Sequence, residues 1–146
     1  MKQLLPVVPL LVFFFAQQTG LAQCDPQMYT NQALQALPSG YNLVKTFRID
    51  GKKGERKRME HSLILNSNTN YVVRVASADG AAKGIEVDLY DARHQLITST
   101  YANKTFLKGF TYKCQLTGRY FLVFRFRDSE SYCGAASLGF KQGSQP

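Results

Sequence analysis

The fold is decided by the stretch Thr117-Gly118-Arg119-Tyr120-Phe121-Leu122-Val123-Phe124-Arg125-Phe126-Arg127-Asp128. Side chains alternate between the two faces of a strand, so one face carries Tyr120, Leu122, Phe124 and Phe126 and the other carries Arg119, Phe121, Val123, Arg125 and Arg127. Aromatic and β-branched residues at this spacing predict a strand with one face in a core and the other face partly exposed to solvent. Turn residues precede and follow it. We expect the segments on both sides of this strand to be its neighbours in a sheet.

The chain from Tyr41 onward repeats this alternation in shorter segments separated by turn residues. The predicted strands lie at residues 41–49, 59–65, 71–75, 85–89, 96–101, 106–114, 119–127 and 132–141. The Thr-rich segment 96–101 is typical of an edge strand, and Gly134-Ala135-Ala136 indicates close packing or a bulge. About eight short strands without alternating helices predict an all-β fold, an antiparallel β-sandwich or jelly roll.

A short helix is predicted before the strands. Asp25 is a good N-cap, Pro26 suits the first helical position, and Pro38-Ser39-Gly40 ends the pattern. Ala33 and Leu37 belong to an apolar stripe along one side. Because three helical turns are not stable alone, we expect this stripe to dock on the sandwich rather than on a partner.

The N-terminus predicts export. Lys2 gives residues 1–22 a positive start, residues 4–16 are apolar, and Gly20-Leu21-Ala22 is typical of a signal-peptide cleavage site. The apolar run is short for a membrane span, and no second one follows. Leu21-Ala22-Gln23-Cys24 also resembles a bacterial lipoprotein signal, with Cys24 as the lipidated residue, although Gln23 stands where a small residue is usual. We expect a periplasmic, cell-surface or extracellular protein, with lipid anchoring as the alternative.

The chain is basic, with 18 Lys and Arg against 10 Asp and Glu and a net charge of +8. Cleavage after Ala22 would remove Lys2 and leave +7. Such a charge draws an exported domain to phosphorylated lipids, acidic glycans or acidic proteins, although a Lys-rich soluble surface has the same composition. Export also argues against a nucleic-acid partner.

Three cysteines, Cys24, Cys114 and Cys133, allow at most one intramolecular disulfide, which export permits. Cys114 and Cys133 are nearest in sequence. If their segments flank the 119–127 strand as hairpin partners, they lie near its opposite ends, and at ~3.3 Å per residue this exceeds the ~7 Å Cα limit for a bridge. Cys24 is therefore an alternative partner for either cysteine, and the pairing stays open.

Two motifs resemble a known family. Ile85-Glu86-Val87-Asp88-Leu89-Tyr90-Asp91, followed by Gln95-Leu96-Ile97, resembles the D-L-x-L-x-D … L strand pair of prepeptidase C-terminal (PPC) domains, and residues 117–124 resemble their G-x-Y-x-(L/V)-x-V strand. The resemblance covers residues 41–141. It implies a compact jelly-roll-like sandwich and a non-catalytic accessory role beside secreted hydrolases. The small size and the signal ending in Ala-Gln also resemble exported proteins of the Bacteroidota.

The two histidines do not predict a metal or catalytic site. His61 lies on the same face of its predicted strand as the neighbouring apolar residues, so we expect it in or beside the core. His94 lies in a turn, and we expect it to be exposed to solvent. Neither has zinc-site spacing. There is no G-x-S-x-G elbow, no glycosidase-like pair of carboxylates and no environment that would activate Cys114 beside His61. We predict that the protein is not an enzyme.

The sequence gives only weak support for a calcium-binding site. Asp88 and Asp91, with Glu86 nearby, fall short of the about six to eight oxygens that Ca²⁺ requires. We therefore expect Asp88 to face solvent on a strand and Asp91 to belong to a turn. No metal and no cofactor are predicted.

Basic residues concentrate in one predicted hairpin. The candidate anion-binding or partner-binding residues are Lys52, Lys53, Arg56, Lys57 and Arg58, together with Arg119, Arg125 and Arg127 as a stripe on the outer face of the 119–127 strand. A solvated hairpin and an edge-protecting charge set are the plain interpretation. Arginine interleaved with Tyr and Phe is also typical of protein interfaces.

The sequence thus predicts a signal peptide at 1–22, a helical segment at 23–40, a PPC-like β-sandwich at 41–141 and a tail at 142–146. The leading hypothesis is an exported accessory module, held to a cell-envelope protein by a face of the sandwich. The alternative is a glycan- or lipid-phosphate-binding protein that uses residues 52–58. A hydrolase that depends on His61 ranks third.

Overall fold

A computed structural model describes residues 24–143. The predicted signal peptide, Gln23 and most of the predicted tail lie outside these residues. The elements are α1 (Pro26–Gln35), β1 (Asn42–Asp50), the 3₁₀ turn η1 (Lys52–Gly54), β2 (Arg58–Leu65), β3 (Thr69–Ser77), β4 (Ile85–Tyr90), β5 (Leu96–Ser99), β6 (Tyr101–Ala102), β7 (Thr105–Phe106), β8 (Gly109–Cys114), β9 (Gly118–Phe126) and β10 (Cys133–Gln142). Within the described residues no helix has the length and apolarity to cross a membrane.

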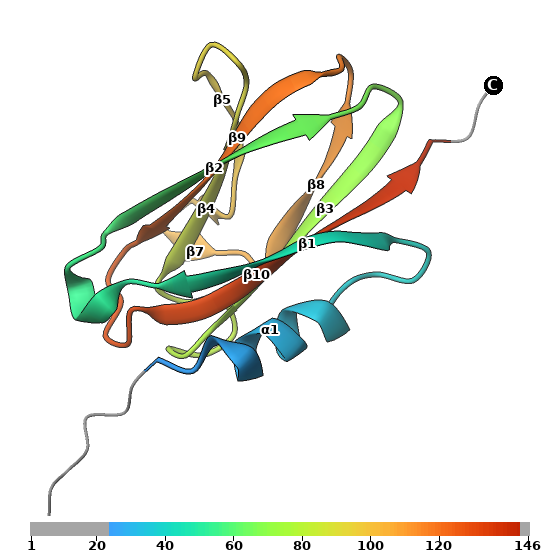
Figure 1. Ribbon diagram of the computed structural model, residues 1–146. Coiled ribbons are helices and arrows are strands. Elements are labelled where there is room, and N and C mark those ends of the chain that lie inside the picture. The colour runs from blue at the N-terminus through green and yellow to red at the C-terminus, as the bar shows by residue number, and fades with distance from the viewer. Residues whose placement is uncertain (1–23, 144–146) are drawn as a thin grey trace, which may run out of the picture.

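Two four-stranded antiparallel sheets face each other (Figure 1). Sheet A has the order β1-β10-β3-β8 and sheet B the order β2-β9-β4-β5. The chain passes from one sheet to the other after β1, β2, β3, β5, β8 and β9, which is the connectivity of a jelly roll. The predicted all-β jelly-roll fold is therefore confirmed.

The neighbours predicted for the central strand are wrong. β9 pairs with β2 and β4, whereas the flanking strands β8 and β10 belong to the opposite sheet. The turns at 115–117 and 127–132 cross between the sheets instead of folding back within one. The segment 52–58 is likewise no hairpin, because it connects β1 of sheet A to β2 of sheet B.

The core lies between the two sheets. It contains the side chains that the alternation along each strand predicted to face inward. β9 contributes Leu122 and Phe124, both fully buried, and β10 contributes Ala136 and Leu138. A Cβ on Gly134 would lie 2.4 Å from Ile85 Cδ1 and 2.5 Å from the Ala76 carbonyl oxygen. The Gly-Ala-Ala segment therefore reflects close packing, as the sequence suggested.

Helix α1 covers the outer face of sheet A, against β1, β3 and β10 (Figure 1). The Asp25 carboxylate accepts a hydrogen bond from the Gln27 N–H (3.0 Å), as expected of an N-cap. Beneath the helix, β10 carries only small residues, and Ser137 Oγ donates to the Ala33 carbonyl at 2.7 Å. The helix and its docking on the sandwich are confirmed. No helix among residues 24–143 covers the outer face of sheet B in the same way.

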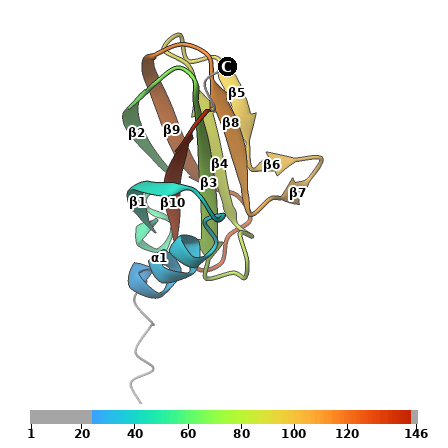
Figure 2. The ribbon, with the colours of Figure 1, turned by 90° about the vertical axis from the view of Figure 1, so that its right-hand side faces the viewer.

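The predicted strand 96–101 is interrupted at Thr100. This residue is fully buried, and its Oγ1 accepts a hydrogen bond from the Val87 N–H at 2.8 Å. Beyond it, β6 and β7 form a small hairpin that projects from the sandwich (Figure 2). Asn103 and Lys104 at its tip have φ of 50° and 60°, as a two-residue type I′ turn requires.

The disulfide joins Cys24 to Cys133, with Cα atoms 5.4 Å apart, and Cys114 is a buried free thiol. In register, Cys114 lies opposite Thr69 at one end of β3, whereas Gly134, next to Cys133, lies opposite Ser77 at the other end. The pair nearest in sequence is therefore separated by the length of a strand. The disulfide uses the Cys24 sulfur, the atom that a lipid thioether would also need.

Candidate binding surface on sheet B

The outer face of sheet B carries a network of ion pairs and hydrogen bonds. Arg125 of β9 donates from Nη1 to Asp88 Oδ2 and from Nη2 to the Tyr90 hydroxyl oxygen, both at 2.7 Å. Arg127 donates from Nε to Glu86 Oε2, also at 2.7 Å. The register of β4 against β9, which places Glu86 opposite Arg125, brings these residues together. Two arginines are thus held by two carboxylates of the neighbouring strand.

The burial of the two carboxylates differs from the prediction. Asp88 was expected to face solvent, yet it is 1% exposed, and Glu86 is 7% exposed. Both lie beneath the arginine side chains, which remain 36% and 45% exposed. Burial alone would lower the pKa of Arg125, but its bonds to Tyr90 and Asp88 outweigh this effect and raise the pKa. The hydrogen bond to Glu86 raises the pKa of Arg127, so both guanidinium groups stay charged.

Aromatic rings accompany these arginines. The Arg127 guanidinium lies over the Tyr101 ring at 4.3 Å from its centroid, which connects the base of the β6–β7 hairpin to the sheet. His94 stacks on Phe121 of β9 with ring centroids 4.3 Å apart and planes 16° from parallel. His94 is exposed, as predicted. Tyrosine, phenylalanine and arginine are enriched at protein interfaces, where a few such residues dominate affinity.

The structure brings together some of the predicted basic residues and separates others. Arg58 lies opposite Arg125 in the β2–β9 register and forms an exposed ion pair with Glu60. Arg119 lies opposite Ile64 at the far end of the same pair of strands. It therefore takes no part in the Arg125–Arg127 network.

The remaining four basic residues, Lys52, Lys53, Arg56 and Lys57, are exposed in the loop that connects β1 and β2. None of them forms a salt bridge with another residue of the described chain. Lys52 and Lys53 both have left-handed backbone conformations, with φ of 47° and 57°. This loop, residues 52–57, is a compact positive surface at the end of the sandwich.

The other residues considered for chemistry have structural partners. His61 is half-buried, with its ring 5.0 Å from Phe47, and burial followed by the nearby Lys45 charge lowers its pKa. Asp91 Oδ1 accepts from the backbone N–H groups of its own turn, at Arg93 and Gln95. Among residues 24–143, no three His, Cys, Asp or Glu side chains are grouped to hold a metal ion.

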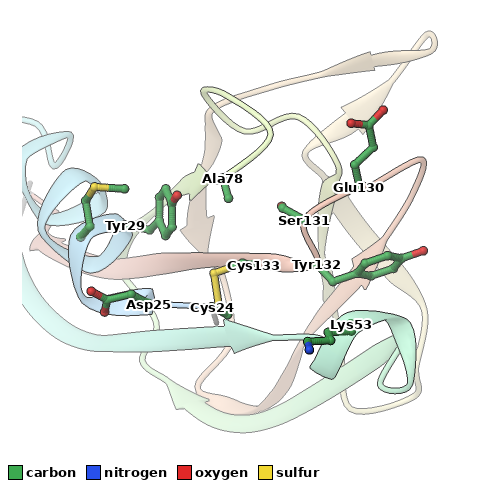
Figure 3. A pocket seen from close by; sticks show the side chains of 10 residues that line it. Cys24, Asp25, Tyr29, Lys53, Ala78, Glu130, Ser131, Tyr132 and Cys133 are labelled. Atoms are coloured by element: carbon green, nitrogen blue, oxygen red, sulfur yellow. A yellow bond between two sulfur atoms is a disulfide. The ribbon is translucent and has the colours of Figure 1, made fainter. Parts of the chain in front are cut away.

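A hollow of about 550 Å³ at one end of the sandwich was not predicted from the sequence (Figure 3). It is lined by Cys24, Asp25, Met28, Tyr29, Lys53, Ala78, Glu130, Ser131, Tyr132 and Cys133. These residues come from four segments that are far apart in the chain: the start of α1 with the two residues before it, η1, the loop after β3, and residues 130–133 at the start of β10. Only the disulfide pairing would have indicated that they meet, and the sequence left that pairing open.

Comparison with known proteins gives no family assignment. No protein-family model matches the chain, and no curated protein does. Among solved structures, the chain is similar to PliG of Aeromonas hydrophila, a periplasmic inhibitor of g-type lysozyme, with 9% identity and a TM-score of 0.43, covering 72% of this chain and 90% of that one. It is also similar to the pre-peptidase C-terminal domain of a Bacillus anthracis collagenase, with 18% identity and a TM-score of 0.42, covering 69% and 89%. The second is a domain of the type that the β4 and β9 motifs resemble, and membership of that family stays a prediction.

Proposed function

We propose that this protein is an exported, non-catalytic accessory module that binds a protein of the cell envelope through the outer face of sheet B. The observation that carries the proposal is the fixed network of Arg125 and Arg127 with Asp88, Glu86 and two tyrosines. It lies on the sandwich face that α1 does not cover. The network presents rigid aromatic and guanidinium groups at a surface.

The network favours a protein partner because its polar groups are already ordered. Immobilising an arginine on binding costs conformational entropy, and here neighbouring side chains have fixed both arginines in advance. Arg127 uses only Nε in its bond to Glu86. Within the described residues nothing accepts from its two terminal NH₂ groups, which leaves a planar fork for a carboxylate or carbonyl of the partner.

Charge balance distinguishes this surface from the basic loop. Two arginines face two carboxylates, so the network has little net charge to attract a distant polyanion. Binding through it should depend weakly on ionic strength, since short contacts in a packed interface are poorly screened.

The test is an affinity pull-down of the exported protein from its own cell envelope at low and high salt. We expect a stoichiometric protein that remains bound at high salt and is lost with Arg127→Ala. The matched control is Arg119→Ala, which removes an exposed arginine from the same face of the same strand but lies outside the network. Equal retention by both variants would refute the proposal.

A second candidate function rests on residues 52–57. Four unpaired cations in one loop would suit lipid phosphates or an acidic glycan. Vesicles with and without phosphatidylglycerol provide the probe. Binding that requires the anionic lipid, weakens steeply with salt and disappears when Lys52, Lys53, Arg56 and Lys57 are changed to Gln would establish it. Binding that survives these changes would exclude it.

A further inference from the structure

We infer that residues 52–57 are the site at which an endopeptidase specific for Lys or Arg cuts the folded protein. The product is a two-chain molecule that the Cys24–Cys133 disulfide holds together. The reaction is the hydrolysis of one peptide bond: the C–N bond breaks, one water molecule is consumed, and a new carboxylate and a new amino group form. The inference uses no residue of the sheet B network, so it does not depend on the proposed function.

The loop between β1 and β2 is exposed to solvent. Lys52, Lys53, Arg56 and Lys57 are all exposed, and none of them forms a salt bridge within residues 24–143. Figure 1 shows this loop at one end of the sandwich, where the chain leaves sheet A for sheet B. Exposed polar loops are the places where proteases preferentially cut a folded protein.

The backbone of the loop is held by few interactions, most of them local. A bond in a folded protein is cut only when the segment around it opens. The N–H groups of Gly54 and Arg56 both donate to the Gly51 carbonyl oxygen, at 3.0 and 2.9 Å. Lys52 and Lys53 have left-handed conformations, in which the Cβ atom crowds the following carbonyl oxygen. Opening the loop therefore relieves strain and breaks no hydrogen bond of either sheet ladder.

The carbonyl groups distinguish two peptide bonds in the loop from the others. The oxygen of the bond to be cut must be free to accept hydrogen bonds from the protease as negative charge develops on it. The carbonyl oxygens of Lys52 and Lys57 already accept backbone hydrogen bonds, at 3.2 and 3.3 Å. Those of Lys53 and Arg56 accept none from the described chain. We therefore expect cleavage after Lys53 or Arg56.

The other basic residues outside the strands are better protected. The carbonyl oxygens of Lys83 and Lys108 accept hydrogen bonds from residues of β3. Arg93 lies in a tight turn closed by a side-chain carboxylate, and Lys104 lies in a two-residue turn that cannot extend unless β6 and β7 separate. The Arg127 side chain is bound to a carboxylate of β4, so it is not free to enter the pocket of a protease.

The two chains of the product stay together. One carries α1 and β1, and the other carries β2 to β10. The disulfide joins them, β1 keeps its pairing with β10, and the hydrogen bond from Ser137 to Ala33 still attaches the helix. Cleavage therefore divides the cations of residues 52–57 between two chain ends and leaves the sandwich folded.

The experiment is a time course of the disulfide-intact, exported protein with a trace of trypsin, followed by intact-mass analysis and denaturing gels. We expect the first product to have the mass of the intact protein plus one water. It should separate into two chains only after reduction, and the shorter chain should end at Lys53 or Arg56. The product should still unfold cooperatively, and the buried Cys114 should stay unreactive toward a thiol reagent.

Two pairs of substitutions at exposed residues complete the test. Lys53→Gln with Arg56→Gln should slow the first cleavage by about tenfold or more, because the bonds that remain in the loop have engaged carbonyl groups. Lys83→Gln with Lys104→Gln, in two other loops, should leave the rate unchanged. First cleavage at any other Lys or Arg, rapid cleavage that persists in the first pair, or loss of cooperative unfolding in the cut protein would each overturn the inference.

Discussion

At the scale of single residues, the Asp88–Arg125 pair is asymmetric. The Asp88 side chain is 2% exposed and the Arg125 side chain is 36% exposed, so only the arginine can turn to water if its partner is removed. Asp88 Oδ1 is also buried and accepts no hydrogen bond from residues 24–143. The negative charge of the buried Asp88 carboxylate is therefore compensated by Arg125.

We expect Arg125→Met to cost about 2–4 kcal/mol of unfolding free energy, because it leaves the Asp88 charge buried and unpaired. Asp88→Asn should cost less, about 1 kcal/mol, because the guanidinium left behind is partly solvated. Urea unfolding of the two variants measures both values, with Arg119→Met as the exposed control. A larger loss for Asp88→Asn would contradict this account.

His61 makes stability depend on pH. Burial and the Lys45 charge lower its pKa in the folded state below the ordinary 6.5, so the unfolded chain takes up a proton first as pH falls. The contribution of His61 is complete above pH 6.5 and is lost as pH falls from there through the folded-state pKa. His61→Gln should flatten the thermal stability profile in that interval. A profile that His61→Gln does not alter would show that other groups set the pH dependence.

At the scale of elements, α1 is attached to the sandwich by a covalent bond at its start and by the Ser137–Ala33 hydrogen bond in its middle. The disulfide closes a loop with a sequence separation of 109 residues. Its removal by Cys24→Ser should lower the unfolding free energy by about 2–4 kcal/mol. Dithiothreitol should lower the melting temperature of the natural protein and have no effect on the Cys24→Ser, Cys133→Ser variant. A natural protein insensitive to dithiothreitol would show that the bond adds nothing.

Local patterns predicted the elements well and their partners poorly. Asp25-Pro26 starts a helix by capping chemistry within a few residues, and the parity of residues 119–127 depends only on alternation. Strand pairing depends on which sheet each turn leads to, and a turn that folds back resembles a turn that crosses over. For this reason the sequence predicted a hairpin at 52–58 and the wrong neighbours for β9.

The two candidate sites also differ in how far local sequence patterns could predict them. The sequence identified Arg125 and Arg127 because arginine alternates with aromatic residues along one strand. It missed that Asp88 lies buried beneath Arg125, since this requires the β4–β9 register. The hollow depends on four segments meeting around a disulfide, and no local pattern encodes that meeting.

At the scale of the whole molecule, Cys114 reports on global unfolding. It is 1% exposed, at the end of β8, and close to the Tyr120 hydroxyl oxygen (3.6 Å) inside the sandwich. We expect one thiol per chain to react with a thiol reagent, slowly under native conditions and in step with unfolding in urea. Cys114→Ala should not react at all. Immediate reaction of the native protein would show that this end of the core is open.

The position of the disulfide also has a mechanical consequence. A force that pulls on the two chain ends passes from Cys24 through the sulfur bridge to Cys133 and then along β10, so residues 25–132 bear no tension. β10 is already an extended strand, held between β1 and β3, and an extended chain can lengthen very little. Under load the molecule should therefore act as a short, nearly inextensible link whose sandwich stays folded.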